Sequence, residues 1–196
     1  MQNPSDPIVV PLAEGFEEIE AVTIVDVLRR AGLLVQVAGL GPGSGAQPVR
    51  GAHGMVLLCD CGLDEVQPER VRALVLPGGM PGTRHLQEDA RVLDLARRLA
   101  ASGRITAAIC AAPLVLAEAG VLEGVRVTAH PSVHDALGAD RVVSEPRVLR
   151  QGTILTSQGP GTALEFSLAL VAQLVGADAA GELARAMLAP APSDAD

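Results

Sequence analysis

The stretch Ile105-Thr-Ala-Ala-Ile-Cys110-Ala-Ala-Pro113 decides the fold class of this chain. Its apolar first half predicts a buried strand, and Pro113 suits the first turn of a helix, where its missing N–H costs nothing. A short turn that begins with Cys110 separates the two elements. Small residues around this turn let a strand and a helix approach closely, as a nucleophile elbow requires. The stretch therefore predicts a β–α unit with a cysteine at its turn.

The same alternation of strand-like and helix-like periods extends along the chain in both directions. We expect strands over 7–12, 34–39, 73–76, 105–109, 125–128 and 153–156, a weaker β segment within 47–60, and helices over 17–31, 91–101, 113–119, 163–175 and 179–188. Strands that alternate with helices predict an α/β fold with a parallel sheet and helices on both faces. We expect one domain over 1–188 and a frayed tail over 189–196.

Composition narrows the classes of function. A chain of 196 residues with 48% apolar residues can form one sizeable core. Its net charge of −8 and its lack of Trp and Tyr argue against nucleic acid as a partner. We see no signal peptide and no apolar run long enough to span a membrane. The 3 cysteines form an odd number and indicate reduced thiols in the cytoplasm.

Cys110 carries the strongest chemical signal. A thiol at the start of a helix meets the positive end of the helix dipole and free amide donors, which favour the thiolate and predict a lowered pKa. The alternative is a small buried apolar residue that ends a strand.

Glu20 is the second candidate. Helical steps forward from Glu20 lead to Ile24, Val27 and Ala31, so this carboxyl group is expected to face inward. Burial raises the pKa of a carboxyl group, and a neutral carboxylic acid could donate a hydrogen bond to a thiolate and move protons. The alternative is that the carboxyl group lies in solvent at the end of the helix, and we prefer this interpretation for Glu17 and Glu18.

Two further segments follow predicted strands. In Leu74-Val-Leu-Pro77-Gly-Gly79, free amides could form an oxyanion hole together with the amide of Ala111. The spacing fits neither a dinucleotide fingerprint nor a phosphate loop. His130 precedes Pro131 and is expected at the same sheet edge as Cys110, as a base or as a lone histidine. Cys59-Asp-Cys61 lacks the second pair that a metal clamp needs, so we predict no metal site there.

These segments together resemble the ThiJ/PfpI superfamily, and most closely the branch of the parkinsonism-associated protein deglycase. The matching stretches are Ala13-Glu-Gly-Phe-Glu-Glu-Ile-Glu20, Val25-Asp-Val-Leu-Arg-Arg-Ala-Gly32, Val37-Ala-Gly-Leu40, Leu74-Val-Leu-Pro-Gly-Gly79, Ala107-Ala-Ile-Cys-Ala-Ala-Pro113, Thr128-Ala-His-Pro131 and Ile154-Leu-Thr-Ser-Gln-Gly-Pro-Gly-Thr162. They recur in order over nearly the whole chain.

The resemblance implies a flavodoxin-like three-layer sandwich of the class I glutamine amidotransferase type, and a homodimer. It implies that Cys110 is the reactive, oxidation-prone cysteine and Glu20 its protonated hydrogen-bond partner, with His130 nearby and the amides of Gly79 and Ala111 as oxyanion donors. Arg30 matches one arginine of the family's dimer interface, whereas His53 stands where the family often has another, so these two residues mark a possible interface or anion site. Gln158 also replaces a common arginine, and nothing in the family matches the extension past Met187.

The function implied is a cofactor-independent glyoxalase or deglycase. The Cys110 thiolate would attack methylglyoxal, glyoxal or their early adducts with amines and thiols. A redox sensor or stress chaperone that works through Cys110 oxidation is the alternative from another class. A cysteine protease is weaker, because no acidic residue adjoins His130, although Asp135 stays open as a partner.

Overall fold

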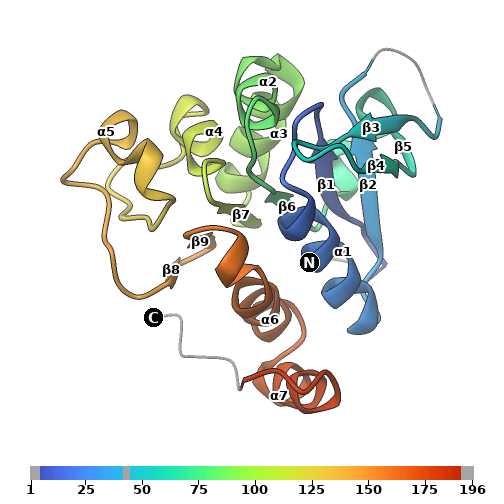
Figure 1. Ribbon diagram of the computed structural model, residues 1–196, viewed down its shortest axis with the longest axis vertical. Coiled ribbons are helices and arrows are strands. Elements are labelled where there is room, and N and C mark those ends of the chain that lie inside the picture. Colours follow the sequence, from blue (N-terminus) through green and yellow to red (C-terminus); the bar gives the residue numbers. More distant parts are fainter. Residues whose placement is uncertain (1–4, 42–44, 191–196) are drawn as a thin grey trace.

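The computed structural model describes residues 5–41 and 45–190. The predicted frayed tail therefore lies mostly outside the described residues. A central sheet has the strand order β5-β2-β1-β6-β7-β9-β8, seen near edge-on in Figure 1. Its strands are, in that order, Cys61–Gly62, Val35–Gly39, Ile8–Leu12, Ala73–Leu76, Ile105–Ile109, Ile154–Ser157 and Val148–Gln151. All neighbouring pairs are parallel except β8 with β9, which are antiparallel.

Helices cover both faces of this sheet, which gives three layers (Figure 1). One face carries α1 (Glu18–Arg30), α6 (Ala163–Leu174) and α7 (Ala177–Ala186), and the other carries α2 (Gly82–Glu88), α3 (Ala90–Ala101), α4 (Pro113–Glu118) and α5 (His134–Leu137). Each face has its own cluster of buried apolar side chains. The predicted α/β fold, flavodoxin-like and with a mostly parallel sheet, is confirmed.

Smaller elements connect the layers. A hairpin of β3 (Pro48–Arg50) and β4 (Val56–Leu58) forms the β segment predicted within 47–60. Single turns of 3-10 helix occur at Leu63–Glu65, Pro68–Arg70, Pro131–Val133 and Pro160–Thr162. Among the described residues, no helix combines the length and the apolar character that a membrane crossing requires.

Three expectations about elements were wrong or incomplete. The strand expected over 125–128 is absent, because Val127 makes only an isolated bridge to Val142. The antiparallel edge strand β8 was missed, because Val148–Gln151 contains Arg150 and Gln151 and shows no run of apolar residues. Helix α2 was also missed, since its short sequence Gly-Thr-Arg-His-Leu-Gln-Glu offers a single large apolar residue, Leu86.

The parallel register places the ends of the central strands at one edge. Leu76 pairs with Ala108, and Ile109 pairs with Ser157. The loops after β6, β7 and β9 therefore emerge side by side, and α1 begins just after β1 at the same edge. This is where ligand sites of open α/β sheets form.

Candidate active site

Cys110 lies on the strained turn that its sequence context predicted. Its φ is 65°, in the left-handed region that side chains rarely adopt, and among the described residues it shares this with one other non-glycine, Leu188. The turn is held on both sides by backbone hydrogen bonds. The Cys110 N–H donates to the carbonyl oxygen of Ser157 in β9 at 2.9 Å, and the Cys110 carbonyl accepts from the N–H of His130 at 2.9 Å. The structure therefore confirms a strand–cysteine–helix elbow.

Glu20 faces inward from the first turn of α1, as the apolar stripe predicted. Its exposed fraction is 0%. Its Oε2 accepts a hydrogen bond from the N–H of Gly78 at 2.7 Å, and its carboxyl group also hydrogen-bonds the thiol of Cys110. Its other oxygen, Oε1, is buried and has no hydrogen-bond partner among the described residues. A carboxyl group with so few donors is suited to carrying a proton.

Gly78 was not singled out in the sequence, although it adjoins the predicted donor Gly79. Its N–H donates to Glu20, and its lack of a side chain leaves space for Cys110 and Glu20 to meet. A Cβ atom at this position would lie 2.7 Å from Cβ of Cys110 and 3.0 Å from Oε2 of Glu20. The signal that could have found it is the Pro77-Gly78-Gly79 run itself, because two adjacent glycines after a strand indicate a close approach.

The amides of Ala111 and Gly79 hydrogen-bond to the Cys110 thiol. Gly79 has a φ of 91°, so its backbone conformation favours glycine. The sequence predicted these two amides as oxyanion donors. The structure gives them a place beside the sulfur, where they can also stabilise negative charge on it.

The acid–base properties of Cys110 and Glu20 belong to the pair. Burial raises the pKa of Glu20 to about 7, against the opposing effect of its hydrogen bonds from Gly78 and Cys110. Burial, followed by the charge of Glu20, raises the pKa of Cys110 to about 12. The prediction that the helix start lowers the cysteine pKa is thus wrong, because burial and a carboxylate outweigh the two amides.

Two hydrogen-bonded acids of this kind titrate as one unit. Between the two pKa values the pair retains one proton and one negative charge. When that proton is on Glu20, the sulfur is a thiolate that accepts hydrogen bonds from the amides of Ala111 and Gly79 and from the carboxylic acid. The geometry thus places a thiolate, when it forms, beside three hydrogen-bond donors.

His130 lies at the predicted sheet edge but is bound to the elbow through its backbone. Its side chain is exposed, and Nδ1 of its ring contacts Oγ of Ser132 at 2.8 Å. Among the described residues, no hydrogen bond connects the His130 ring to Cys110. Its role as a base stays a prediction.

Arg30 and His53 do not pair with each other. Nε of Arg30 binds Asp26 at 2.6 Å on the surface of α1, whereas Nδ1 of His53 binds Oε2 of the buried Glu18 at 2.8 Å. The hydrogen bond with Glu18 raises the pKa of His53. The preference for a solvated Glu17 and Glu18 was wrong, because both residues are buried and the hairpin after β3 covers Glu18.

The other cysteines differ from Cys110. Cys59 and Cys61 are buried, and Cys110 is partly exposed. Burial raises the pKa of Cys59 to about 11. Within the described part of the chain, neither has a carboxyl partner of the kind that Glu20 provides, so Cys110 is the thiol of the three that combines partial exposure with a buried carboxyl partner.

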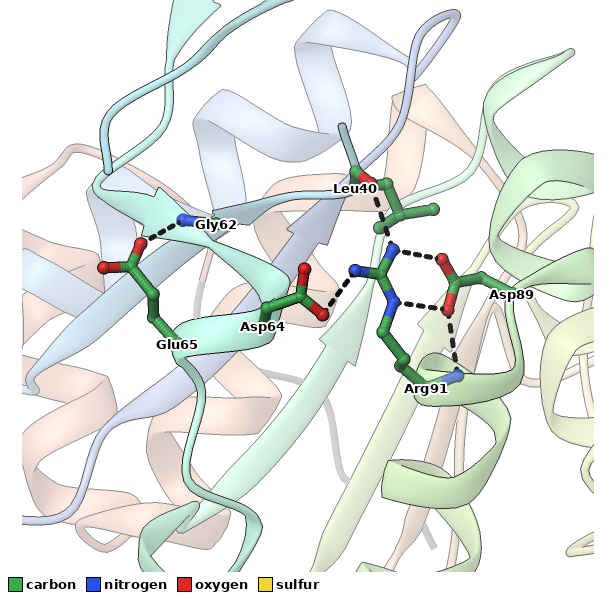
Figure 2. A network of polar contacts seen from close by, with 6 residues as sticks. All are labelled: Leu40, Gly62, Asp64, Glu65, Asp89 and Arg91. Atoms are coloured by element: carbon green, nitrogen blue, oxygen red, sulfur yellow. Dashed lines mark hydrogen bonds and ion pairs between the residues drawn. The ribbon is translucent and has the colours of Figure 1, made fainter. Parts of the chain in front are cut away.

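A second polar network has the opposite character (Figure 2). Arg91, at the start of α3, donates to both carboxylate oxygens of Asp89, at 3.0 and 2.5 Å, to Asp64 at 2.8 Å and to the carbonyl of Leu40 at 3.0 Å. The network connects α3 to the segments that follow β2 and β5. Although burial acts in the opposite direction, the hydrogen bonds with Arg91 lower the pKa of Asp89.

Comparison with known proteins identifies the family. The model of the DJ-1/PfpI family matches residues 6–173. The chain belongs to the DJ-1/PfpI family. This DJ-1/PfpI protein is 40% identical over 185 residues to the protein dj-1beta of Drosophila melanogaster, covering 94% of this chain and 97% of that protein. The family expected from the motifs is thus confirmed.

Two more similarities concern function and structure. The glutathione-independent glyoxalase DJR-1.2 of Caenorhabditis elegans is 36% identical to this DJ-1/PfpI protein over 172 residues, 87% of this chain and 89% of that protein. A solved structure of oxidized Toxoplasma gondii DJ-1 superimposes with a TM-score of 0.88 at 36% identity, covering 93% of this chain and 98% of that one. The family therefore includes glyoxalase enzymes.

Proposed function

We propose that this protein is a cofactor-independent glyoxalase that acts on methylglyoxal or glyoxal, and on their early adducts with amines and thiols as a deglycase. The observation that carries the proposal is the buried pair of Cys110 and Glu20, in which the pKa of the carboxyl group is raised to about 7. A group with that pKa can both donate and accept a proton near neutral pH. The similarity to a glyoxalase of Caenorhabditis elegans supports the same activity.

The first step is addition to the aldehyde. The sulfur of Cys110 forms a bond to the aldehyde carbon of methylglyoxal, and the carbonyl oxygen gains the electron pair of the broken π bond. The amides of Gly79 and Ala111 stabilise this oxygen as negative charge develops. Glu20 then donates its proton to the oxygen, which yields a neutral hemithioacetal.

The second step is an internal redox rearrangement. Glu20, now a carboxylate, removes the proton from the former aldehyde carbon and returns it to the neighbouring ketone carbon through an enediol. The aldehyde carbon is oxidised to a thioester and the ketone is reduced to an alcohol, so no external oxidant or reductant is needed. Water then hydrolyses the thioester, releasing lactate and regenerating the thiol. We propose His130 as the group that assists this water.

The experiment is lactate formation from methylglyoxal by the purified protein without added cofactor. Wild type should turn over, and Cys110→Ser and Glu20→Gln should each lose at least about a thousandfold in rate, as expected when a nucleophile or its proton donor is removed. The matched control is Cys59→Ala, which removes a buried thiol outside the site and should retain activity. An inactive wild type, or a Cys110→Ser variant as active as the control, would refute the proposal.

The partial exposure of Cys110, compared with the two buried cysteines, favours a second function. Cys110 is the partly exposed thiol of the three, and its amides and Glu20 could equally hold the oxygens of a sulfinic acid. We propose that oxidation of Cys110 would switch the protein to a sensing role in the cytoplasm, where thiols are reduced at rest. Mass spectrometry after mild peroxide should show two added oxygens on Cys110 and none on Cys59.

We also propose a homodimer. Large apolar side chains are exposed on α1 and on the β3–β4 hairpin. These two elements lie side by side, because Glu18 of α1 accepts hydrogen bonds from the N–H groups of His53 and Met55 in the hairpin. These side chains are Ile19, Val22, Met55, Val56 and Leu58. Exposed apolar patches of this kind often mark interfaces. Ile19→Asp should convert the dimer to a monomer in light scattering, whereas the surface control Leu188→Asp should not.

A further inference from the structure

We propose that His130 takes part in the reaction as a hydrogen-bond donor, through the N–H at Nε2 of its ring, and that Ser132 is the residue that positions it. Ser132 contacts the ring through two atoms. Its backbone N–H donates to Nδ1 of His130 at 3.2 Å, and its Oγ lies 2.8 Å from the same nitrogen. The inference rests on the proposed glyoxalase function and names the part that His130 plays in it.

The contacts of Nδ1 decide the tautomer of the His130 ring. A backbone N–H can only donate, so the ring nitrogen that accepts from Ser132 carries no proton. The hydroxyl of Ser132 then also donates to Nδ1, because a nitrogen without a proton can only accept. A neutral imidazole has one proton on its two nitrogens, and in His130 this proton therefore lies on Nε2.

The backbone around His130 holds the ring in this arrangement. The residue directly precedes the 3-10 turn Pro131–Val133, and its side chain caps that turn. Its N–H donates to the carbonyl of Cys110 at 2.9 Å, and its own carbonyl accepts from the N–H of Val133 at 3.0 Å. Pro131 restricts the chain further, because a proline limits the conformation of the residue before it. The turn thus commits Nδ1 to a structural hydrogen bond and leaves Nε2 for other partners.

The edge of the ring that contains Nε2 lies near the loop after β9. A Cβ atom at Gly159 would lie 3.5 Å from Cδ2 of His130, which is the ring carbon bonded to Nε2. Just before this loop, the carbonyl of Ser157 accepts the N–H of Cys110. Nε2 makes no hydrogen bond within the described part of the chain, and the side chain is exposed. A donor without a partner therefore lies beside the loop that holds the cysteine elbow.

This tautomer determines what His130 can do for the water that hydrolyses the thioester. Nε2 cannot remove a proton from that water, because it already carries one, but its N–H can hold the water in place. One lone pair of the water accepts from Nε2–H, and the other forms the bond to the thioester carbon.

The proton and the electrons of this step are accounted for by Cys110 and Glu20. As the C–S bond breaks, its electron pair stays on the sulfur of Cys110. The proton of the water goes to Glu20, which is a carboxylate at this point of the reaction. The lactic acid that forms loses its own proton to solvent, so the pair returns to a thiolate beside a carboxylic acid.

The first test is NMR spectroscopy of the ring nitrogens in isotope-labelled protein, at a pH where imidazoles are neutral. We expect the signal of a bare nitrogen for Nδ1 of His130 and that of a protonated nitrogen for Nε2. His85 is the internal control, because its Nδ1 contacts the carbonyl oxygen of Glu14 at 3.1 Å and must carry the proton. The two histidines should therefore show opposite patterns in one spectrum, and a protonated Nδ1 in His130 would overturn the proposal.

The second test replaces the imidazole of His130 with two different amides. The amide nitrogen of Gln can occupy the position of Nε2, whereas that of Asn reaches only the position of Nδ1, and neither amide acts as a base. His130→Ala and His130→Asn should slow thioester hydrolysis about a hundredfold, as expected when a reacting group loses its orientation. His130→Gln should be at least about tenfold faster than either, because it keeps the donor. Mass spectrometry of protein quenched during turnover measures the thioester on Cys110, which accumulates when this step slows.

Equal losses in the three His130 variants would indicate that the residue removes a proton, and rates equal to wild type would indicate that it takes no part. Either result would overturn the proposal. An inactive wild type in which Nε2 of His130 carries the proton would instead refute the glyoxalase function. An active wild type in which Nδ1 carries it would refute the donor role alone.

Ser132→Ala tests the positioning residue, because it removes the shorter of the two contacts with Nδ1 and keeps the backbone N–H. The Nδ1 signal of His130 should move toward that of a protonated nitrogen, and thioester hydrolysis should slow about two- to tenfold, the equivalent of one hydrogen bond. Ser132→Thr keeps a hydroxyl and should restore both. The matched control is Ser144→Ala, at an exposed serine outside this turn, which should change neither. An unchanged Nδ1 signal in Ser132→Ala would show that the Ser132 hydroxyl does not position the ring.

Discussion

Glu20 and Asp89 are two carboxyl groups of the same fold with opposite shifts in pKa. Asp89 accepts hydrogen bonds from the guanidinium and the amide of Arg91, and its pKa is lowered. Glu20 is more deeply buried and, within the described part of the chain, has no cation beside it, and its pKa is raised to about 7. The difference shows that burial alone does not decide the charge of a carboxyl group. The partner decides whether the group holds the fold together or is available for proton transfer.

The surroundings of Asp89 and of Glu20 also differ in what they contribute to the protein. Around Asp89, hydrogen bonds and charge balance connect three segments of the chain (Figure 2). Around Glu20, one oxygen accepts from Gly78, and the other has no hydrogen-bond partner among the residues that the structure describes. Sites that retain such unsatisfied groups often carry function at a cost to stability. We therefore expect changes near Glu20 to affect activity, and changes near Asp89 to affect stability.

The largest effect is expected from Gly78→Ala. The new Cβ would lie 2.7 Å from Cβ of Cys110, so the elbow must move. A displacement of about 1 Å in a catalytic group can cost about a hundredfold in rate, and we expect at least that loss of lactate formation. Gly161→Ala is the control, because a Cβ there meets open space. Equal activities of the two variants would show that Gly78 does not set the distance between Cys110 and Glu20.

The next effect concerns the pH dependence of stability. Burial raises the pKa of Glu20 from 4.5 to about 7 on folding, so folded protein keeps a proton that unfolded protein has lost. The free energy of unfolding therefore falls as pH rises through this window. Because the glutamine amide mimics the neutral acid, Glu20→Gln should match wild type near pH 4 and exceed it by about 3 kcal/mol near pH 8.

Asp89→Asn should give the opposite pattern. The pKa of Asp89 is lower in the folded protein than its ordinary value of 3.8, so the ionised group stabilises the fold at pH values above 3.8. This stabilisation is lost as the pH falls through the lower pKa of the folded protein. The Asn variant should be less stable than wild type at neutral pH and approach it in acid. Urea unfolding of both variants across pH measures the two slopes. Parallel slopes would contradict the contrast between the two carboxyl groups.

A smaller effect is expected from Arg91→Met. The Arg91 side chain is 38% exposed and that of Asp89 is 15% exposed, so solvent screens part of the pair. We expect a loss of about 1–2 kcal/mol in the free energy of unfolding, with lactate formation unchanged. Arg84→Met removes an exposed pair with Glu88 and should cost no more than about 0.5 kcal/mol. Equal costs in the two variants would indicate that the Arg91 network adds nothing beyond a surface ion pair.

Much of the fold could be predicted because its signals are local. Apolar runs such as 73–76 and 105–109 gave strands with the same bounds in the structure. The small residues around Cys110 indicated the elbow, and the stripe after Glu20 indicated its inward face. Elements with mixed composition were missed, as β8 shows, since an antiparallel edge strand needs no continuous apolar run.

The electrostatics could not be predicted in the same way. The charge state of Cys110 depends on Glu20, which lies far away in the chain, and on how deeply both are buried. The position of His53 between Glu17 and Glu18 depends on the β3–β4 hairpin folding over α1. Such contacts between distant segments follow from packing, and local periodicity does not encode them.

The proposed chemistry depends on Cys110 and Glu20 sharing one proton and presenting a thiolate beside a carboxylic acid. The ultraviolet absorbance of the thiolate reports this state, when it is recorded from about pH 5 to about pH 9 as the difference between wild type and Cys110→Ser. We predict a thiolate signal below about pH 9 in wild type, from the form of the pair whose proton lies on Glu20, and a changed signal in Glu20→Gln. Absence of any thiolate signal below about pH 9 would contradict the shared proton, because the proton would then remain on sulfur while Glu20 is ionised.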